Sequence, residues 1–136
     1  MTYSTITWTL VDDVMVSFAL PGVISDESYG RWIKDFSTKK FSKYLVTTVG
    51  IVQLTSVQRK GVAEVLRRRT VHAVVLTDEM LVRGLVTAIS WMGVDMKAFP
   101  WSEMKAAIKH LQVAPVVEER LLEVVLRLKS GGRLAQ

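Results

Sequence analysis

The chain has 136 residues, of which 49% are hydrophobic and 23% are charged, a composition typical of one globular domain rather than a disordered segment. It contains no cysteine, which excludes disulfides, thiolate zinc sites and cysteine nucleophiles. The net charge of +5 is mildly basic and is compatible with a nucleic acid or an acidic protein partner without requiring either.

The first third of the chain predicts a hairpin followed by a helix. Residues 5–11 and 14–20 alternate polar and apolar side chains, which is typical of half-buried strands, and the two aspartates between them are turn residues. Pro21 ends the second strand. Ser25 is a candidate N-cap for a helix that should end near Thr38. The apolar face of this helix is formed by Tyr29, Trp32, Ile33 and Phe36.

Two strand–helix pairs are predicted next. Residues 44–49 have an apolar strand pattern, and a short loop leads from them into a helix over residues 56–69. Residues 71–76 form a nearly continuous apolar run, as expected of a central strand that is covered on both faces. Thr77 and Asp78 then cap a third helix that should stop at a glycine. Its buried face is expected to consist of Leu81, Leu85, Ala88, Ile89 and Met92.

The C-terminal part predicts one more strand and two helices. Residues 94–99 form the strand, and Pro100 is a suitable first residue of the helix that follows. We expect Trp101 to be partly exposed at this helix start and Trp91 to lie in the core. A final amphipathic helix should end at Gly131, since apolar side chains recur at helical spacing. These side chains are Val117, Leu121, Val124 and Leu128.

This order of elements predicts an α/β fold. We expect a single mixed, mostly parallel sheet of about five strands with an N-terminal hairpin, helices packed on it, and an extra C-terminal helix. Residues 1–113 should form the domain, and residues 114–136 the C-terminal amphipathic helix and tail. The chain start lacks the basic and apolar regions of a signal peptide, and no apolar run is long enough to span a membrane. The expected location is therefore the cytoplasm.

Little in the sequence points to an enzyme. His72 lies in a predicted buried strand and His110 at a helix end, and neither is near a nucleophile motif. Acidic pairs fall at turns and helix starts, and no glycine-rich phosphate loop occurs. We therefore expect no catalytic residue, no metal and no cofactor. The basic residues of segment 59–69 are typical of a solvated helix face, and the lack of interleaved aromatic residues disfavours nucleic acid as a partner.

The most informative feature is a pair of hydroxyl side chains, Thr55 and Ser56, between a strand and a helix. Hydroxyls at a helix N-terminus can cap the free backbone N–H groups. The same position also exposes a hydroxyl in a field that favours negative charge, so an added phosphate would be stabilised there. The sequence leaves both the cap and the phosphorylation switch open.

From about Thr5 to Val113 the order of elements resembles the STAS domain, the sulfate transporter and anti-sigma factor antagonist fold. More closely, it is similar to the antagonist-like proteins of bacteria, in which a strand leads to an aspartate, one or two serines and a helix with an early Gly-Leu or Gly-Val pair. The corresponding segment here is residues 52–57, followed by Gly61 and Val62. Ser56 falls at the position of the phosphoacceptor and Thr55 at that of the aspartate. Further stretches that fit are residues 74–78, 91–94, 96–99 and 103–111.

The resemblance implies a non-enzymatic regulatory module that binds a protein partner, either a regulator or a kinase of the anti-sigma type. Ser56 or Thr55 would be the phosphoacceptor, and a phosphate of about −1.5 to −2 charges there could abolish docking. The implied contact surface consists of Val57, Arg59, Lys60, Thr77 and Asp78. Two alternatives stay open: a small-molecule or lipid-binding carrier, and a homo-oligomeric scaffold, such as a homodimer, built through the last helix.

Overall fold

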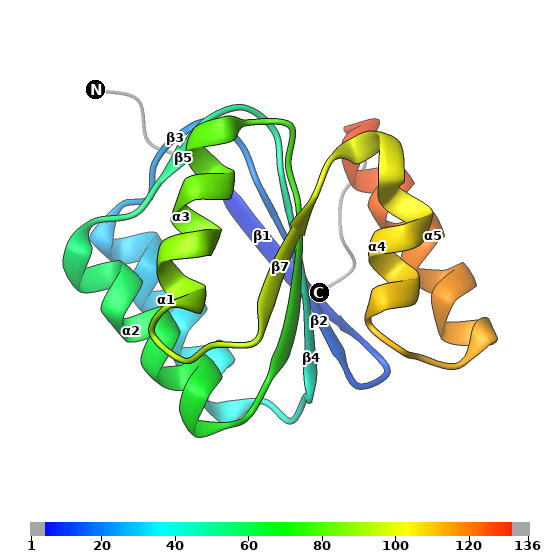
Figure 1. Ribbon diagram of the computed structural model, residues 1–136, viewed down its shortest axis with the longest axis horizontal. Coiled ribbons are helices and arrows are strands. Elements are labelled where there is room, and N and C mark those ends of the chain that lie inside the picture. Colours follow the sequence, from blue (N-terminus) through cyan, green and yellow to red (C-terminus); the bar gives the residue numbers. More distant parts are fainter. Residues whose placement is uncertain (1–4, 132–136) are drawn as a thin grey trace.

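A five-stranded mixed sheet runs through the middle of the computed structural model, which describes residues 5–131 (Figure 1). The strand order is β1-β2-β4-β6-β7, and only β1 runs antiparallel to its neighbour. This confirms the predicted α/β fold with a mixed, mostly parallel sheet. The strands are β1 (Ile6–Val11), β2 (Val14–Ala19), β4 (Lys43–Thr48), β6 (His72–Leu76) and β7 (Met96–Phe99).

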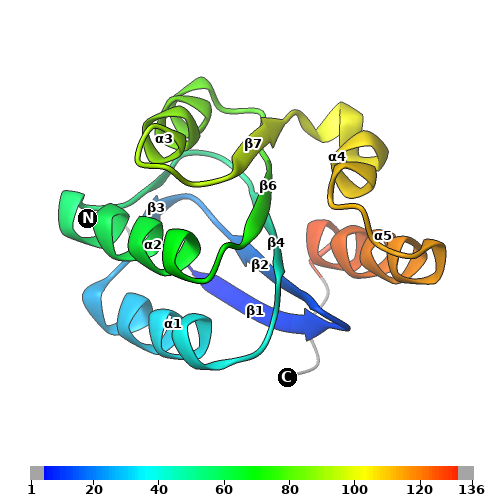
Figure 2. The same ribbon diagram turned by 60° about the horizontal axis from the view of Figure 1, so that its bottom comes forward.

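Helices cover both faces of this sheet (Figures 1 and 2). One face carries α1 (Asp26–Thr38), α2 (Ser56–Arg68) and α3 (Met80–Ser90). The other face carries the 3₁₀ turn η1 (Trp101–Glu103), α4 (Met104–His110) and α5 (Pro115–Lys129). A short parallel pair, β3 (Gly22–Val23) and β5 (Val52–Gln53), forms a second small sheet. No helix in the range 5–131 is long and apolar enough to cross a membrane.

The N-terminal hairpin forms as the sequence predicts. β1 and β2 pair antiparallel with Val11 opposite Val14, so Asp12 and Asp13 form a two-residue turn. Asp12 has a φ of 54°, in the left-handed region that aspartate tolerates better than most residues. The polar pair at this position therefore sets the register of the hairpin.

Strands that follow one another in the chain lie next to one another in the main sheet, so the strand order never reverses. From β2 the chain passes to β4, then to β6 and then to β7, and each crossover helix lies on the same face. Nucleotide sites of open α/β sheets usually form where the strand order reverses, and this sheet has no such crevice between its parallel strands. The loops at the carboxyl ends of β4 and β6 instead lead into the first turns of α2 and α3.

Aromatic side chains form the centre of the core beneath α1 and α2. Phe36 is fully buried and stacks on Trp32 with ring centroids 4.8 Å apart, and it also contacts Tyr44 at the same centroid distance. Gly61 permits the close approach of α2 to α1, because a Cβ atom there would collide with the Tyr29 hydroxyl. The face of α1 predicted from helical spacing is thus the face that packs.

The last helix is part of the core on the opposite face of the sheet. The side chains of Leu121 and Val125 are fully buried and share a cluster with Val14 and Leu45 of the central strands. Val117 and Leu128 are buried as predicted, whereas Val125 replaces Val124 in the buried stripe. Although residues 114–136 are predicted to be a separate segment, α5 completes the second helical layer. Its apolar stripe is therefore unavailable as a dimer seam.

The buried face of α3 differs from the predicted one. Leu81 is 67% exposed and Met92 37% exposed, whereas Val82 and Val86 are buried together with the correctly predicted Ile89. The sequence of α3 is apolar on most sides, so two overlapping stripes both have helical spacing. The position of the sheet selects one of them. The helix also starts later than predicted, at Met80 with Glu79 as N-cap.

The environments of two tryptophans are the opposite of those expected from the sequence. Trp91 is 83% exposed just after the end of α3, although it was expected in the core. Trp101 is buried rather than partly exposed, because its indole N–H donates to the carbonyl oxygen of Thr48 at 2.9 Å. Lys129 of α5 then lies over the Trp101 ring, 4.5 Å from its centroid. A tertiary hydrogen bond, which the local pattern does not reveal, decides the burial of Trp101.

Candidate functional site

The hydroxyl pair lies where the sequence predicts it, at the start of α2. Thr55 is the N-cap: its Oγ1 accepts a hydrogen bond from the backbone N–H of Gln58 at 3.1 Å. The Gln58 Oε1 atom in turn accepts from the backbone N–H of Thr55 at 3.0 Å, which completes a capping box. The interpretation as a cap therefore holds for Thr55, whose hydroxyl is used in fixing the first turn.

Gln58 holds this first turn against the neighbouring helix. Its side chain is buried, and its Nε2 atom donates to the carbonyl oxygen of Ile24 at 3.0 Å and to Oδ1 of Asp26 at 3.2 Å. These partners lie at the start of α1, so one amide joins the N-termini of two helices. The sequence interpretation missed Gln58, although the Thr-x-x-Gln spacing from Thr55 to Gln58 is itself a capping-box signal.

Both members of the hydroxyl pair are exposed, and Ser56 is the one whose hydroxyl is not used by the cap. It is the first residue of α2, and its Oγ atom accepts a hydrogen bond from Nη2 of Arg59 at 3.0 Å. The first turn of α2 contains no acidic residue. A helix N-terminus and a guanidinium group both favour a nearby anion, and here nothing in the turn opposes them. The surroundings of the Ser56 hydroxyl thus suit a phosphate group.

Exposed apolar side chains lie beside this hydroxyl and at the start of the next helix. Val57 is 78% exposed, and Met80 and Leu81 of α3 are 82% and 67% exposed. Because β4 and β6 are parallel neighbours, the helices that follow them begin at the same end of the sheet. We call this group the α2–α3 surface; it consists of Ser56, Val57, Arg59, Lys60, Met80 and Leu81.

Other apolar side chains are exposed at the same end of the molecule. Among residues 5–131, eleven large apolar side chains are exposed, and six of them follow the carboxyl ends of β2, β4 or β6. Besides the three on the α2–α3 surface, these are Leu20, Val49 and Ile51. Just over half of the exposed large apolar side chains in residues 5–131 therefore lie at the end where the hydroxyl lies.

Two further residues expected on the contact surface have other roles. Thr77 is fully buried, and its Oγ1 accepts from the backbone N–H of Glu79 at 3.1 Å, so its side chain is not available to a partner. Asp78 is exposed, but its Oδ1 accepts from the backbone N–H of Trp101 at 3.0 Å. Both side chains shape the loop after β6, and neither belongs to the α2–α3 surface: Thr77 is buried, and the carboxylate of Asp78 is bonded to the backbone of Trp101.

The two histidines lie together at the other end of β6. Nδ1 of His72 is 2.7 Å from Oδ2 of Asp95, and its Nε2 is 2.7 Å from the carbonyl oxygen of His110. Both ring nitrogens of His72 thus contact oxygen acceptors and are not directed at a hydroxyl. Partial burial lowers the pKa of His110, and the charges of His72 and Lys97 add to this effect. These side chains are not placed to activate Ser56.

The arginines at the end of α2 make specific contacts rather than an open basic patch. Nη1 of Arg69 donates to the carbonyl oxygen of Phe36 at 2.6 Å, and its guanidinium lies over the Phe41 ring. Nη1 of Arg67 donates to the carbonyl oxygen of Met92 at 2.9 Å. They join the C-terminal ends of three helices. In the described part of the chain, no three histidine, aspartate or glutamate side chains are grouped to hold a metal ion.

Comparison with known proteins gives no family assignment. The chain matches no model of a known protein family and no curated protein. The resemblance to the STAS domain thus depends on the order of elements and on the segment from residue 52 to Val62.

Proposed function

We propose that this chain is a cytoplasmic, non-enzymatic, STAS-like module that binds a regulatory protein through the α2–α3 surface and releases it when Ser56 is phosphorylated. The observation that carries the proposal is the exposed Ser56 hydroxyl beside the exposed side chain of Val57. The partner class that fits is a regulator or kinase of the anti-sigma type.

The apolar character of the surface supports a protein partner. Protein interfaces combine a desolvated apolar centre with a polar rim. Val57, Met80 and Leu81 would supply the centre, and Arg59 and Lys60 the rim. The positive rim further favours an acidic partner surface.

The same position explains how a phosphate would act as a switch. In the free protein, a phosphate of about −1.5 to −2 charges on Ser56 would be stabilised by the N-terminus of α2 and by Arg59. In the complex it would have to enter an apolar contact beside Val57, where desolvation of the charge opposes binding. Phosphorylation therefore favours the free protein. Thr55 is the poorer acceptor, because the cap engages its hydroxyl.

Phosphate mapping tests the switch. The protein is incubated with ATP and a serine kinase of the anti-sigma type, and the modified residue is located by mass spectrometry. We expect one phosphate on Ser56, none in Ser56→Ala, and unchanged modification in Thr55→Asn. Asparagine keeps an N-cap side chain but removes the hydroxyl. An unmodified Ser56 in the wild-type protein would refute the switch.

A further inference from the structure

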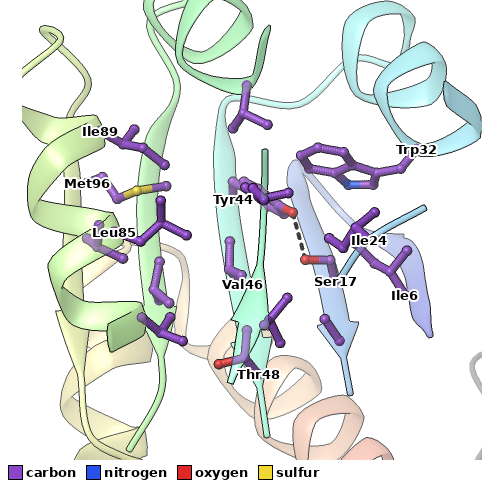
Figure 3. A pocket seen from close by; sticks show the side chains of 17 residues that line it. Ile6, Ser17, Ile24, Trp32, Tyr44, Val46, Thr48, Leu85, Ile89 and Met96 are labelled. Carbon is purple, nitrogen blue, oxygen red and sulfur yellow. Dashed lines mark hydrogen bonds between the residues drawn. The ribbon is translucent and has the colours of Figure 1, made fainter. Parts of the chain in front are cut away.

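A cavity lies between the sheet and the helices α1 to α3. Its volume is about 80 Å³, it is partly open, and side chains from the sheet and from all three helices line it (Figure 3). The lining is almost wholly apolar and includes Ile24, Val46, Leu85, Ile89 and Met96. No charged side chain lines the cavity.

Four polar side chains lie in this apolar lining, and one of them, Thr48, donates its hydroxyl to the carbonyl oxygen of Leu76 at 3.4 Å. The Trp32 side chain is 4% exposed, and its Nε1 is the one buried side-chain polar atom within residues 5–131 that has no hydrogen-bond partner. The hydroxyls of Ser17 and Tyr44 bond to each other at 2.7 Å. Figure 3 shows the indole nitrogen and the two hydroxyl oxygens on the same side of the pocket, and the Trp32 and Tyr44 ring centroids are 6.2 Å apart.

One donor of this group, the indole N–H of Trp32, is left without a protein acceptor. The Ser17 and Tyr44 hydroxyls are bonded to each other, and neither is aligned to accept the indole N–H of Trp32. Burial raises the pKa of the Tyr44 hydroxyl far above its usual range, and the nearby Ser17 and Trp32 offset this only in part, so the phenol keeps its proton. Leaving a buried donor without a partner is unfavourable, so an acceptor brought to Trp32 Nε1 would be stabilised.

We propose that this cavity is a binding site for a small neutral molecule with an apolar body and one hydrogen-bond acceptor oxygen, such as a short-chain ketone, ester or lactone. The oxygen would accept the indole N–H of Trp32, and the apolar body would lie against the side chains of α3. The lack of a charged side chain excludes a carboxylate or phosphate head, because its charge would be buried unpaired.

The volume limits the size of this molecule. A cavity of roughly 150 Å³ lined by apolar side chains is known to hold benzene, so about 80 Å³ suits a molecule of about half that size. Because the cavity is partly open, a slightly longer chain can extend toward the surface. A five-carbon ketone has as many non-hydrogen atoms as benzene, so its carbonyl end would lie in the cavity and its propyl chain would extend toward the surface. Its binding is independent of whether Ser56 is a switch.

Solution NMR tests the site with 2-pentanone as the probe. The Trp32 Nε1–H signal of ¹⁵N-labelled protein is identified by its loss in Trp32→Phe. The comparison ligand is 2-methyl-1-pentene, which replaces the carbonyl oxygen by a CH₂ group and keeps the shape. We expect a saturable downfield shift of the Trp32 signal with the ketone and not with the alkene. Trp32→Phe should weaken ketone binding about fivefold, because the variant lacks the one hydrogen bond to the ketone oxygen.

Two further variants test whether the ketone binds in this cavity. Trp91→Phe removes an exposed indole by the same substitution and should leave ketone binding unchanged. Val46→Phe should fill the cavity and abolish binding; if it fails to fold, the wild-type titration still decides. The proposal is refuted if the Trp32 signal does not move at high ketone concentration. Equal affinity for ketone and alkene, unchanged in Trp32→Phe, would equally refute it, because the cavity would then be only a packing defect.

Discussion

Replacing Leu121 by alanine is expected to lower the free energy of unfolding by about 3 kcal/mol. Leu121 lies in the middle of α5, and its side chain is fully buried in the cluster that joins this helix to the central strands. Removal of three carbon atoms there loses apolar burial and leaves a void that the rigid sheet cannot fill by relaxation. The result would show that α5 belongs to the folding unit.

The matched control for this variant is on the same helix. Leu126 is 53% exposed, so Leu126→Ala should change stability by less than about 0.5 kcal/mol. Urea unfolding of the two variants, followed by tryptophan fluorescence, gives both values. Equal, small effects would mean that α5 is an appendage whose contacts with the sheet contribute little.

Replacing Gln58 by alanine is expected to cost about 2–3 kcal/mol. The substitution removes three side-chain hydrogen bonds, to the backbone N–H of Thr55, the carbonyl oxygen of Ile24 and the carboxylate of Asp26. Ile24 is buried, so its carbonyl oxygen would be left without this donor in a place with little access to water. The backbone bond from Gln58 to Thr55 Oγ1 would remain.

An exposed glutamine provides the control for Gln58→Ala. Gln53 lies on β5 only a few residues earlier, and Gln53→Ala should change stability by less than about 0.5 kcal/mol. Thermal unfolding measures both, and hydrogen exchange at the Thr55 amide should accelerate only in Gln58→Ala. A loss below about 0.5 kcal/mol for Gln58→Ala would contradict the role given to this side chain in fixing the start of α2.

Local patterns were sufficient to predict the fold. Alternation in residues 5–11, the apolar run in residues 71–76 and the N-cap at Ser25 all have direct counterparts in β1, β6 and α1. These features depend on neighbours in the sequence and on the period of each element. The face of α3 and the environments of Trp91 and Trp101 depended instead on what the rest of the chain placed against them, and there the predictions were wrong.

The site was predicted in part for the same reason. A strand, two hydroxyls and a helix pattern are contiguous, so the position of Thr55 and Ser56 could be predicted. The role of Gln58 depends on Ile24, 34 residues away, and the cavity depends on Ser17 and Tyr44, 27 residues apart. No periodicity encodes such pairs. The capping-box spacing was the one local signal that could have identified Gln58.

Site-specific photo-crosslinking tests most directly whether the α2–α3 surface binds a protein. A photoreactive phenylalanine analogue replaces Val57 or Met80. The control position is Leu126, which lies on the other helical layer. All three side chains are more than half exposed. We predict that positions 57 and 80 crosslink the same partner protein in cells, that position 126 does not, and that Ser56→Asp removes the crosslinks. No partner at position 57, or an equally strong crosslink from position 126, would contradict the proposed docking surface.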